Sequence, residues 1–142
     1  MIVVSDTSPI TSLITIQRID LLQDLFDTVL IPPAVERELL AFHDKLPNFI
    51  RVEATLDLAT FQRLQPLLDE GEAEAIALAK KEKPDWLLID ETKGRVIAEA
   101  EGLRVIGLAG ALSISAAPTV SAIAGPRAVS PPSSSRLRES EI

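Results

Sequence analysis

Short apolar runs alternate with longer segments of helical periodicity along most of the chain. The runs lack in-and-out alternation, so they predict strands that are covered on both faces. These strands are Ile2–Val4, Thr28–Ile31, Trp86–Ile89 and Arg104–Ile106, with Phe49–Val52 as a short or edge strand. The helical segments repeat apolar residues at i, i+3 and i+4. They are Pro9–Phe26, Ala34–Phe42 after Pro33, Leu58–Leu68, Glu72–Lys83 and Lys93–Glu101.

Three residues qualify this pattern of helices. Asp20 is expected to cap the helical stretch that follows it, because a short acid accepts hydrogen bonds from helix-start amides. Pro66 is expected to bend or end its helix. Gly71 is expected to interrupt the pattern before the next helix resumes. These residues therefore predict where helices begin and end.

Strands that alternate with helices predict an α/β fold with a central parallel sheet and helices on both faces. In such sheets the functional cleft lies beyond the carboxyl ends of the strands. The expected domain covers residues 1–112. Residues 113–142 are rich in Ser, Ala and Pro, and this composition predicts a disordered, irregular tail.

Two aspartates directly follow predicted strands. Asp6 ends the first strand in "VVSDTS", and Asp90 ends the most apolar one in "WLLID". Each has a simpler explanation, a helix cap for Asp6 and a salt bridge with Lys93 for Asp90. Both also lie at the sheet end where a functional cleft is expected, so both are candidate site residues.

Glu38 lies at the edge of the apolar face of its helix. Successive helical residues turn by about 100°, which places Val35, Leu39 and Phe42 on one packed face with Glu38 beside it. An ordinary solvated glutamate explains this position equally well. Glu38 is therefore a candidate only in combination with other acids.

Glu72 and Glu74 open the same helix, where acids favour the positive end of the helix dipole. Glu72 shares a face with Ala75 and Ile76, which must be the packed face. Glu74 falls nearly opposite, so it is expected to point to solvent. The helical phase therefore favours Glu72 as the acid directed at the sheet end.

The composition narrows the chemistry of such a site. The chain has 142 residues, no Cys, one His and a net charge of −7, which excludes thiolate and His-cluster metal sites. An acidic chain does not bind nucleic acid by bulk electrostatics. At an effective dielectric near 20, two like charges about 4 Å apart repel by about 4 kcal/mol. Converging carboxylates therefore require shared protons or metal ions, and all-oxygen ligands select Mg²⁺ or Mn²⁺.

Five segments in order resemble the PIN-domain superfamily, and in particular a prokaryotic PIN-like branch related to the ribonucleases of toxin–antitoxin pairs. The segments are "VVSDTSPI", "IPPAVERELL", "GEAEAIALA", "LLIDETKGR" and "GLRVIGLAGAL". The resemblance implies a three-layer α/β/α sandwich and a Mg²⁺-dependent ribonuclease site. It assigns catalysis and metal binding to Asp6, Glu38, Glu72 and Asp90, with Ser8 and Glu91 as secondary candidates.

The resemblance also implies partners. It implies RNA as substrate, a small antitoxin protein as inhibitor and a homodimer. The apolar runs are far shorter than the roughly 20 residues of a membrane helix, so a cytoplasmic protein without membrane contact is expected. Because the tail departs from the family pattern after Leu112, a catalytically impaired PIN-like binding module is the alternative.

Overall fold

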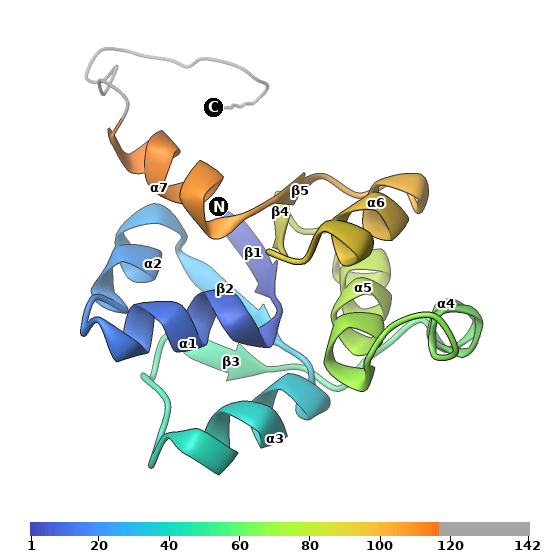
Figure 1. Cartoon of the computed structure of the whole chain (residues 1–142), viewed down its shortest axis with the longest axis horizontal. Coiled ribbons are helices and arrows are strands. Elements are labelled where there is room, and N and C mark those ends of the chain that lie inside the picture. Colours follow the sequence, from blue (N-terminus) through green and yellow to red (C-terminus); the bar gives the residue numbers. More distant parts are fainter. Residues whose placement is uncertain (117–142) are drawn as a thin grey trace. The chain divides into compact units, whose positions relative to one another are not determined.

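Five short strands and seven helices alternate along residues 1–116, the part of the chain that this computed structural model describes (Figure 1). They are β1 (Ile2–Ser5), α1 (Thr7–Thr15), α2 (Asp20–Leu25), β2 (Thr28–Ile31), α3 (Pro33–Phe42), β3 (Ile50–Val52), α4 (Leu58–Leu64), α5 (Glu70–Glu82), β4 (Trp86–Leu88), α6 (Thr92–Ala100), β5 (Val105–Ile106) and α7 (Leu108–Ala116). Residues Met1–Ala111 form one unit, and Leu112 begins another, of which the described residues include only the end of α7.

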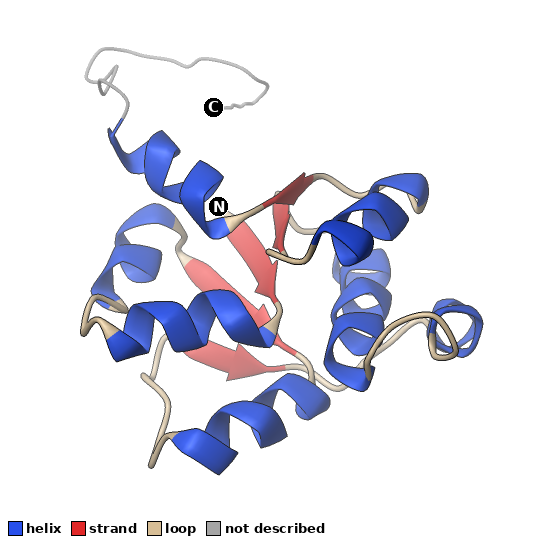
Figure 2. Cartoon of the chain, viewed as in Figure 1, coloured by secondary structure: helices blue, strands red, loops and turns tan. Residues whose placement is uncertain are grey.

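All five strands are parallel and lie in the order β3-β2-β1-β4-β5. β1 is the central strand, with Val3 opposite Val29 of β2 on one side and Trp86 of β4 on the other. Figure 2 shows helices on both sides of the sheet. The predicted α/β fold around a parallel sheet is confirmed.

Successive strand residues supply two separate cores, because side chains alternate between the faces of a sheet. Val3 belongs to the core that α1, α2 and α3 cover. Val4 belongs to the core that α4, α5 and α6 cover. Both side chains are fully buried, which explains why the strands read as continuous apolar runs and confirms the three-layer sandwich.

The predicted helical stretch Pro9–Phe26 consists of two helices, and the second begins at Asp20, where a new helix start was expected. The chain turns between α1 and α2, where Gln17 adopts a left-handed backbone with φ of 60° and the Arg18 N–H donates to the Leu13 carbonyl at 2.8 Å. Asp20 is not the cap of α2. Its carboxylate instead pairs with the Arg18 guanidinium at 3.2 Å, which leaves Ile19 in the cap position.

Two further expectations about helices are also wrong. Gly71 does not interrupt the helix that follows, because it lies inside the first turn of α5. Phe42 does not pack with Val35 and Leu39, because it sits in the last turn of α3 and is 81% exposed. The expectation for Pro66 holds, since α4 ends at Leu64.

The described residues also bear on the membrane and tail predictions. Within residues 1–116, no helix has the length and apolar character that crossing a membrane would require. Helix α7 continues through Ala116, beyond the predicted boundary at Leu112. Residues 117–142 of the predicted tail lie outside the described part of the chain.

Candidate functional site

Asp6 lies at the carboxyl end of the central strand and is only 6% exposed. Its N–H donates to the Leu88 carbonyl of β4 at 3.0 Å, so the sheet fixes its backbone. It occupies the cap position of α1, yet its side chain makes no capping hydrogen bond. The helix-cap explanation therefore does not account for this carboxylate.

Glu38 approaches Asp6 from helix α3. The Thr7 hydroxyl donates a hydrogen bond to Glu38 Oε1, which holds the carboxylate over the start of α1. A Cβ atom placed on Gly71 would lie 2.9 Å from Glu38 Oε1 and 3.5 Å from Asp6 Oδ1. The two carboxylates thus converge on one point of α5, where only a glycine leaves them room.

Glu72 completes the inner part of the site from α5. Its side chain is 5% exposed, and a Cβ atom on Gly94 of α6 would lie 3.3 Å from Glu72 Oε2. Its backbone N–H donates to Asp69 Oδ1 at 2.8 Å, which fixes the first turn of the helix. Asp6 and Glu72 form a buried floor, while Glu38 lies at the exposed rim.

The acids of this site influence one another's pKa values. The pKa of Asp6 is raised to about 6, chiefly by burial and also by the charges of Asp69, Glu38 and Asp90, while a hydrogen bond from the Thr7 backbone opposes the rise. Burial likewise raises the pKa of Glu72 to about 7, with added repulsion from Asp69, Asp6 and Glu91. The four predicted acids therefore share one sheet end, and near neutral pH Glu72 is partly protonated while Asp6 is mostly ionised.

Asp90 has a second, structural role. Its Oδ1 accepts a hydrogen bond from the Leu108 N–H at 2.7 Å, where α7 begins. The Arg95 guanidinium donates to its backbone carbonyl at 3.0 Å. The predicted alternative, a salt bridge with Lys93, is not among the ion pairs of residues 1–116.

The secondary candidates occupy the periphery of the site. Glu91 is an exposed residue in the cap position of α6, and its charge contributes to the raised pKa of Glu72. Ser8 is exposed on the first turn of α1. Its neighbour Thr7, which the sequence did not single out, makes the hydroxyl contact with Glu38.

Asp69 is an acid of this site that the sequence reasoning missed. It caps α5 through its hydrogen bond with the Glu72 N–H. Its charge raises the pKa of both Asp6 and Glu72. The signal was available, since Asp69 and Glu72 have the spacing of a cap residue and the acid three positions later.

The expectation that Glu74 points to solvent is wrong. Glu74 is 9% exposed, and its Oε1 accepts a hydrogen bond from the Ala34 N–H in the first turn of α3 at 2.9 Å. Pro32, in the cap position of α3, has no side-chain oxygen to fill that role. The far side of α5 faces a second helix rather than water, and Glu74 caps that helix.

A sequence profile described as a PIN domain matches residues 2–118. The chain belongs to the PIN-domain family. PIN domains are in general nucleases, and they typically use divalent metal ions. No curated protein matches the sequence at a significant level.

The acids of this PIN domain are of the chemical type that binds a divalent metal ion. As they stand, however, their side chains do not surround one point as a set of ligands. Their donors are all carboxylate oxygens, which suit Mg²⁺ and Mn²⁺. Among residues 1–116, however, no three acidic or histidine side chains are grouped closely enough to hold an ion. Binding an ion would therefore require side-chain rotation, most readily of the exposed Glu38.

Proposed function

We propose that this PIN domain is a Mg²⁺- or Mn²⁺-dependent ribonuclease that hydrolyses RNA phosphodiesters, and that it is the toxin of a toxin–antitoxin pair. The observation that carries the proposal is the convergence of Asp6 and Glu38 on Gly71, beside the buried Glu72. Buried carboxylates in mutual repulsion are destabilising unless protons or cations offset their charge. A cation site is the function that such an arrangement supports best.

The overall charge makes cations necessary for the proposed substrate. With a net charge of −7, the protein repels the phosphates of RNA unless the site itself becomes positive. A bound divalent ion would stabilise the phosphoryl charge as a Lewis acid. It would also lower the pKa of the water molecule bound to it toward neutral pH. The phosphate would thus be recognised at the acids rather than on a basic surface.

Each acid has a distinct part in this proposal. Asp6 and Glu72 form the fixed floor, because the sheet and the first turn of α5 hold their backbones. Glu38 is the adjustable ligand at the rim, steadied by the Thr7 hydroxyl. Asp90 adds its charge while it anchors the start of α7. The proton that Glu72 partly retains near neutral pH would be released when the acids bind a cation.

Cleavage of a labelled single-stranded RNA in Mg²⁺, in Mn²⁺ and in EDTA tests the proposal. We expect cleavage only with metal, and a loss on the order of 100-fold or more in Asp6→Asn and Glu72→Gln. Glu82→Gln, at the other end of the same helix, is the matched control and should cleave normally. Cleavage that persists in EDTA, or that Asp6→Asn leaves intact, would overturn the assignment.

The toxin role has a separate readout. Expression of the chain should arrest the growth of a bacterial host, and Asp6→Asn should relieve the arrest at equal protein level. Normal growth under expression of an RNA-cleaving protein would remove the toxin role while leaving the ribonuclease in place.

A PIN-like binding module without catalysis is the second candidate. The observation that favours it is that the acids of residues 1–116 are not grouped as a ready ligand set. This candidate predicts that RNA stays intact in Mn²⁺ even when the metal raises the thermal stability of the chain by mass action.

A further inference from the structure

One arginine lies at the same end of the sheet as the candidate acids. Asp90 follows β4 and Gly107 follows β5, so both lie at the carboxyl edge, beside the strand that ends at Asp6. The Arg95 side chain reaches this edge from α6, and its Nη1 donates to the Asp90 carbonyl at 3.0 Å. A Cβ atom placed on Gly107 would lie 2.9 Å from Arg95 Nη1 and 3.2 Å from Asp90 Oδ1. The guanidinium and the carboxylate therefore approach the same point, where a glycine leaves them room.

Arg95 differs from the other arginines of residues 1–116 in its burial and in its partners. It is half-buried, whereas every other arginine in this part of the chain is exposed. Its one hydrogen bond among the described residues goes to the Asp90 carbonyl, and it takes part in none of their salt bridges. A guanidinium has five N–H donors and stays charged in proteins. Arg95 therefore offers a permanent positive charge and unused donors beside the acids.

The unused donors of Arg95 suit the oxygens of a phosphate group. A guanidinium presents its N–H groups as a planar fork that matches two phosphate oxygens. Neighbouring strands of a sheet lie about 5 Å apart, so the end of β4, which Arg95 contacts, is one such step from the end of β1 at Asp6. A nucleic-acid strand that crosses the acids along the sheet edge therefore also passes Arg95.

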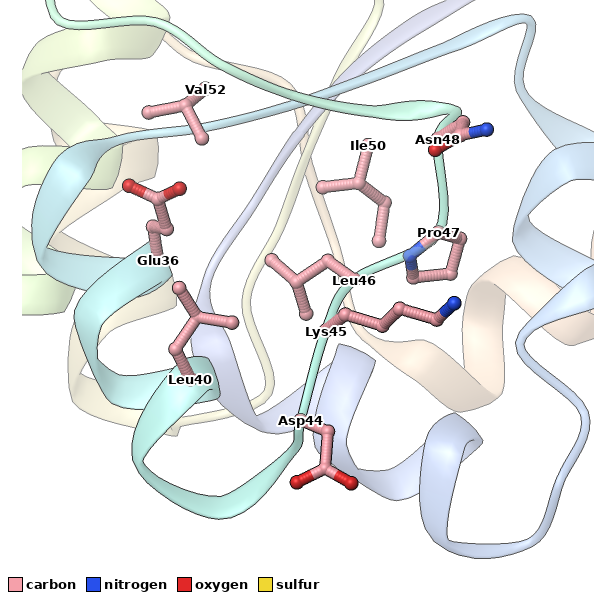
Figure 3. Close-up of a pocket in the computed structure, with 9 residues that line it drawn as sticks. All are labelled: Glu36, Leu40, Asp44, Lys45, Leu46, Pro47, Asn48, Ile50 and Val52. Atoms are coloured by element: carbon pink, nitrogen blue, oxygen red, sulfur yellow. The ribbon is translucent and has the colours of Figure 1, made fainter.

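The pocket beside β3 does not offer a competing site for a phosphate. It has a volume of about 340 Å³ and lies between α3, the loop 44–48 and β3 (Figure 3). The charged residues that line it are Glu36, Asp44 and Lys45, so negative charge outweighs positive charge there. None of the lining residues belongs to the candidate site. The edge that carries Arg95 is therefore the better place for an anionic ligand.

We propose that Arg95 binds a backbone phosphate of the RNA, next to the phosphate that lies over Asp6 and Glu72. The inference rests on the proposed ribonuclease function, and it adds a substrate-binding residue that is not one of the acids. Nε and Nη2 of Arg95 would donate to the two non-bridging oxygens, while Nη1 keeps its bond to the Asp90 carbonyl. Because phosphate contacts carry no sequence information, Arg95 would position the strand whatever its bases are.

Binding of a labelled single-stranded RNA by the full chain, measured by fluorescence anisotropy over a series of salt concentrations, tests the proposal. Measurement in Mg²⁺ uses Asp6→Asn as the background, so that the RNA stays intact. Adding Arg95→Gln should weaken binding by about 10-fold. It should also reduce the slope of log K against log salt by about 0.7, the value for one phosphate contact on a single strand. Arg95→Lys should keep the slope and lose part of the affinity, because lysine has the charge without the fork.

The matched control is Arg104→Gln, which removes the same charge at the opposite, amino end of the sheet. Arg104 directly precedes β5, and its guanidinium carbon lies 4.3 Å from the centre of the Trp86 ring. This variant should leave the RNA affinity and the salt slope unchanged. Equal losses in Arg95→Gln and Arg104→Gln would mean that total charge, rather than a contact, governs binding, and would overturn the proposal.

A purely structural role for Arg95 has a different signature. Loss of its bond to the Asp90 carbonyl alone would lower the melting temperature and leave the salt slope unchanged, which would overturn the proposal. So would a protein that binds no RNA at low salt, or an effect of Arg95→Gln on oligo-U that is absent on oligo-A. Failure of the proposed ribonuclease is a separate result, in which RNA stays intact with the parent chain in Mg²⁺ and Mn²⁺ whether or not Arg95→Gln weakens binding.

Discussion

At the scale of single residues, two glycines set how closely the acids approach one another. Gly71 leaves space for Glu38 and Asp6 against α5, and Gly94 leaves space for Glu72 against α6. Both glycines lie inside helices, where glycine is disfavoured relative to alanine by about 1 kcal/mol. Their presence in helical turns is explained by the carboxylates that they accommodate.

Gly71→Ala should therefore weaken metal binding without lowering the stability of the fold. The new Cβ would lie 2.9 Å from Glu38 Oε1, and that flexible side chain can rotate away. We expect a melting temperature equal to or above that of the parent, because helix propensity improves by about 1 kcal/mol. The affinity for Mn²⁺, measured by calorimetry, should fall several-fold because Glu38 no longer meets Asp6.

The matched control for Gly71→Ala is Glu82→Ala, an exposed substitution at the far end of α5. It should leave Mn²⁺ affinity unchanged. Unaltered Mn²⁺ affinity in Gly71→Ala would show that the position of Glu38 beside Asp6 does not matter for binding.

Residue types and helical phase predicted much of the candidate site. Asp6 and Asp90 follow buried strands, and the wheel around α5 directed Glu72 inward, as the structure has it. The hydrogen bond from Leu108 to Asp90 could not be predicted. It joins residues eighteen positions apart across β5, and no local pattern encodes where a connecting loop returns.

At the scale of elements, the sequence located α5 but described its surroundings wrongly. Every residue from Gly71 to Ala79 is buried, because α5 packs against the sheet on one side and α3 on another. A helical wheel assumes one packed face and one solvated face, so it directed Glu74 to water. The small alanine side chains along α5 were the signal of a helix covered all round.

Substitution of Glu74 should destabilise α3. Glu74→Ala leaves the Ala34 N–H without its acceptor, at a cost of about 1–2 kcal/mol in the free energy of unfolding. Glu74→Gln keeps an acceptor oxygen and loses only the attraction between a charge and the helix dipole, about 0.3–1 kcal/mol. Urea unfolding measures both changes, with Glu82→Ala as the exposed control.

The ranking of these variants is the decisive result. Equal stability of Glu74→Ala and the parent would mean that water replaces the carboxylate at the start of α3. A Glu74→Gln variant as unstable as Glu74→Ala would mean that charge, rather than the hydrogen bond, is what α3 requires.

At the scale of the whole molecule, the fold was largely predictable. Fully covered strands that alternate with helices permit few arrangements other than a parallel sheet between two helical layers. A helix start at Asp20 was expected, but the left-handed backbone of Gln17 between α1 and α2 was not, because its residue type does not signal it.

Without metal, the protein should lose stability as pH rises from 5 to 8. The pKa values of Asp6 and Glu72 are raised to about 6 and about 7 in the folded state, so folding takes up protons in this range. The contribution is fully present near the unfolded pKa values and is lost as pH passes through the folded ones. Thermal unfolding in EDTA should show a fall on the order of 4 kcal/mol.

Added Mg²⁺ should reverse this trend, with a large stabilisation at pH 8 and little at pH 5, where protons compete for the same oxygens. The double variant Asp6→Asn/Glu72→Gln should show a flat profile between pH 5 and pH 8 in EDTA. A parent protein that is most stable at pH 8 without metal would contradict the raised pKa values of these two acids.

The central position of β1 governs the order in which the protein takes shape during synthesis. β1 leaves the ribosome first, yet one of its two neighbours, β4, begins only at Trp86. A nascent chain can pair β1 with β2 and bring Asp6 near Glu38, but Glu72 and Asp90 join later. We therefore expect the proposed ribonuclease activity to be absent from a nascent chain until nearly the whole domain has emerged, which would protect the messenger that encodes it.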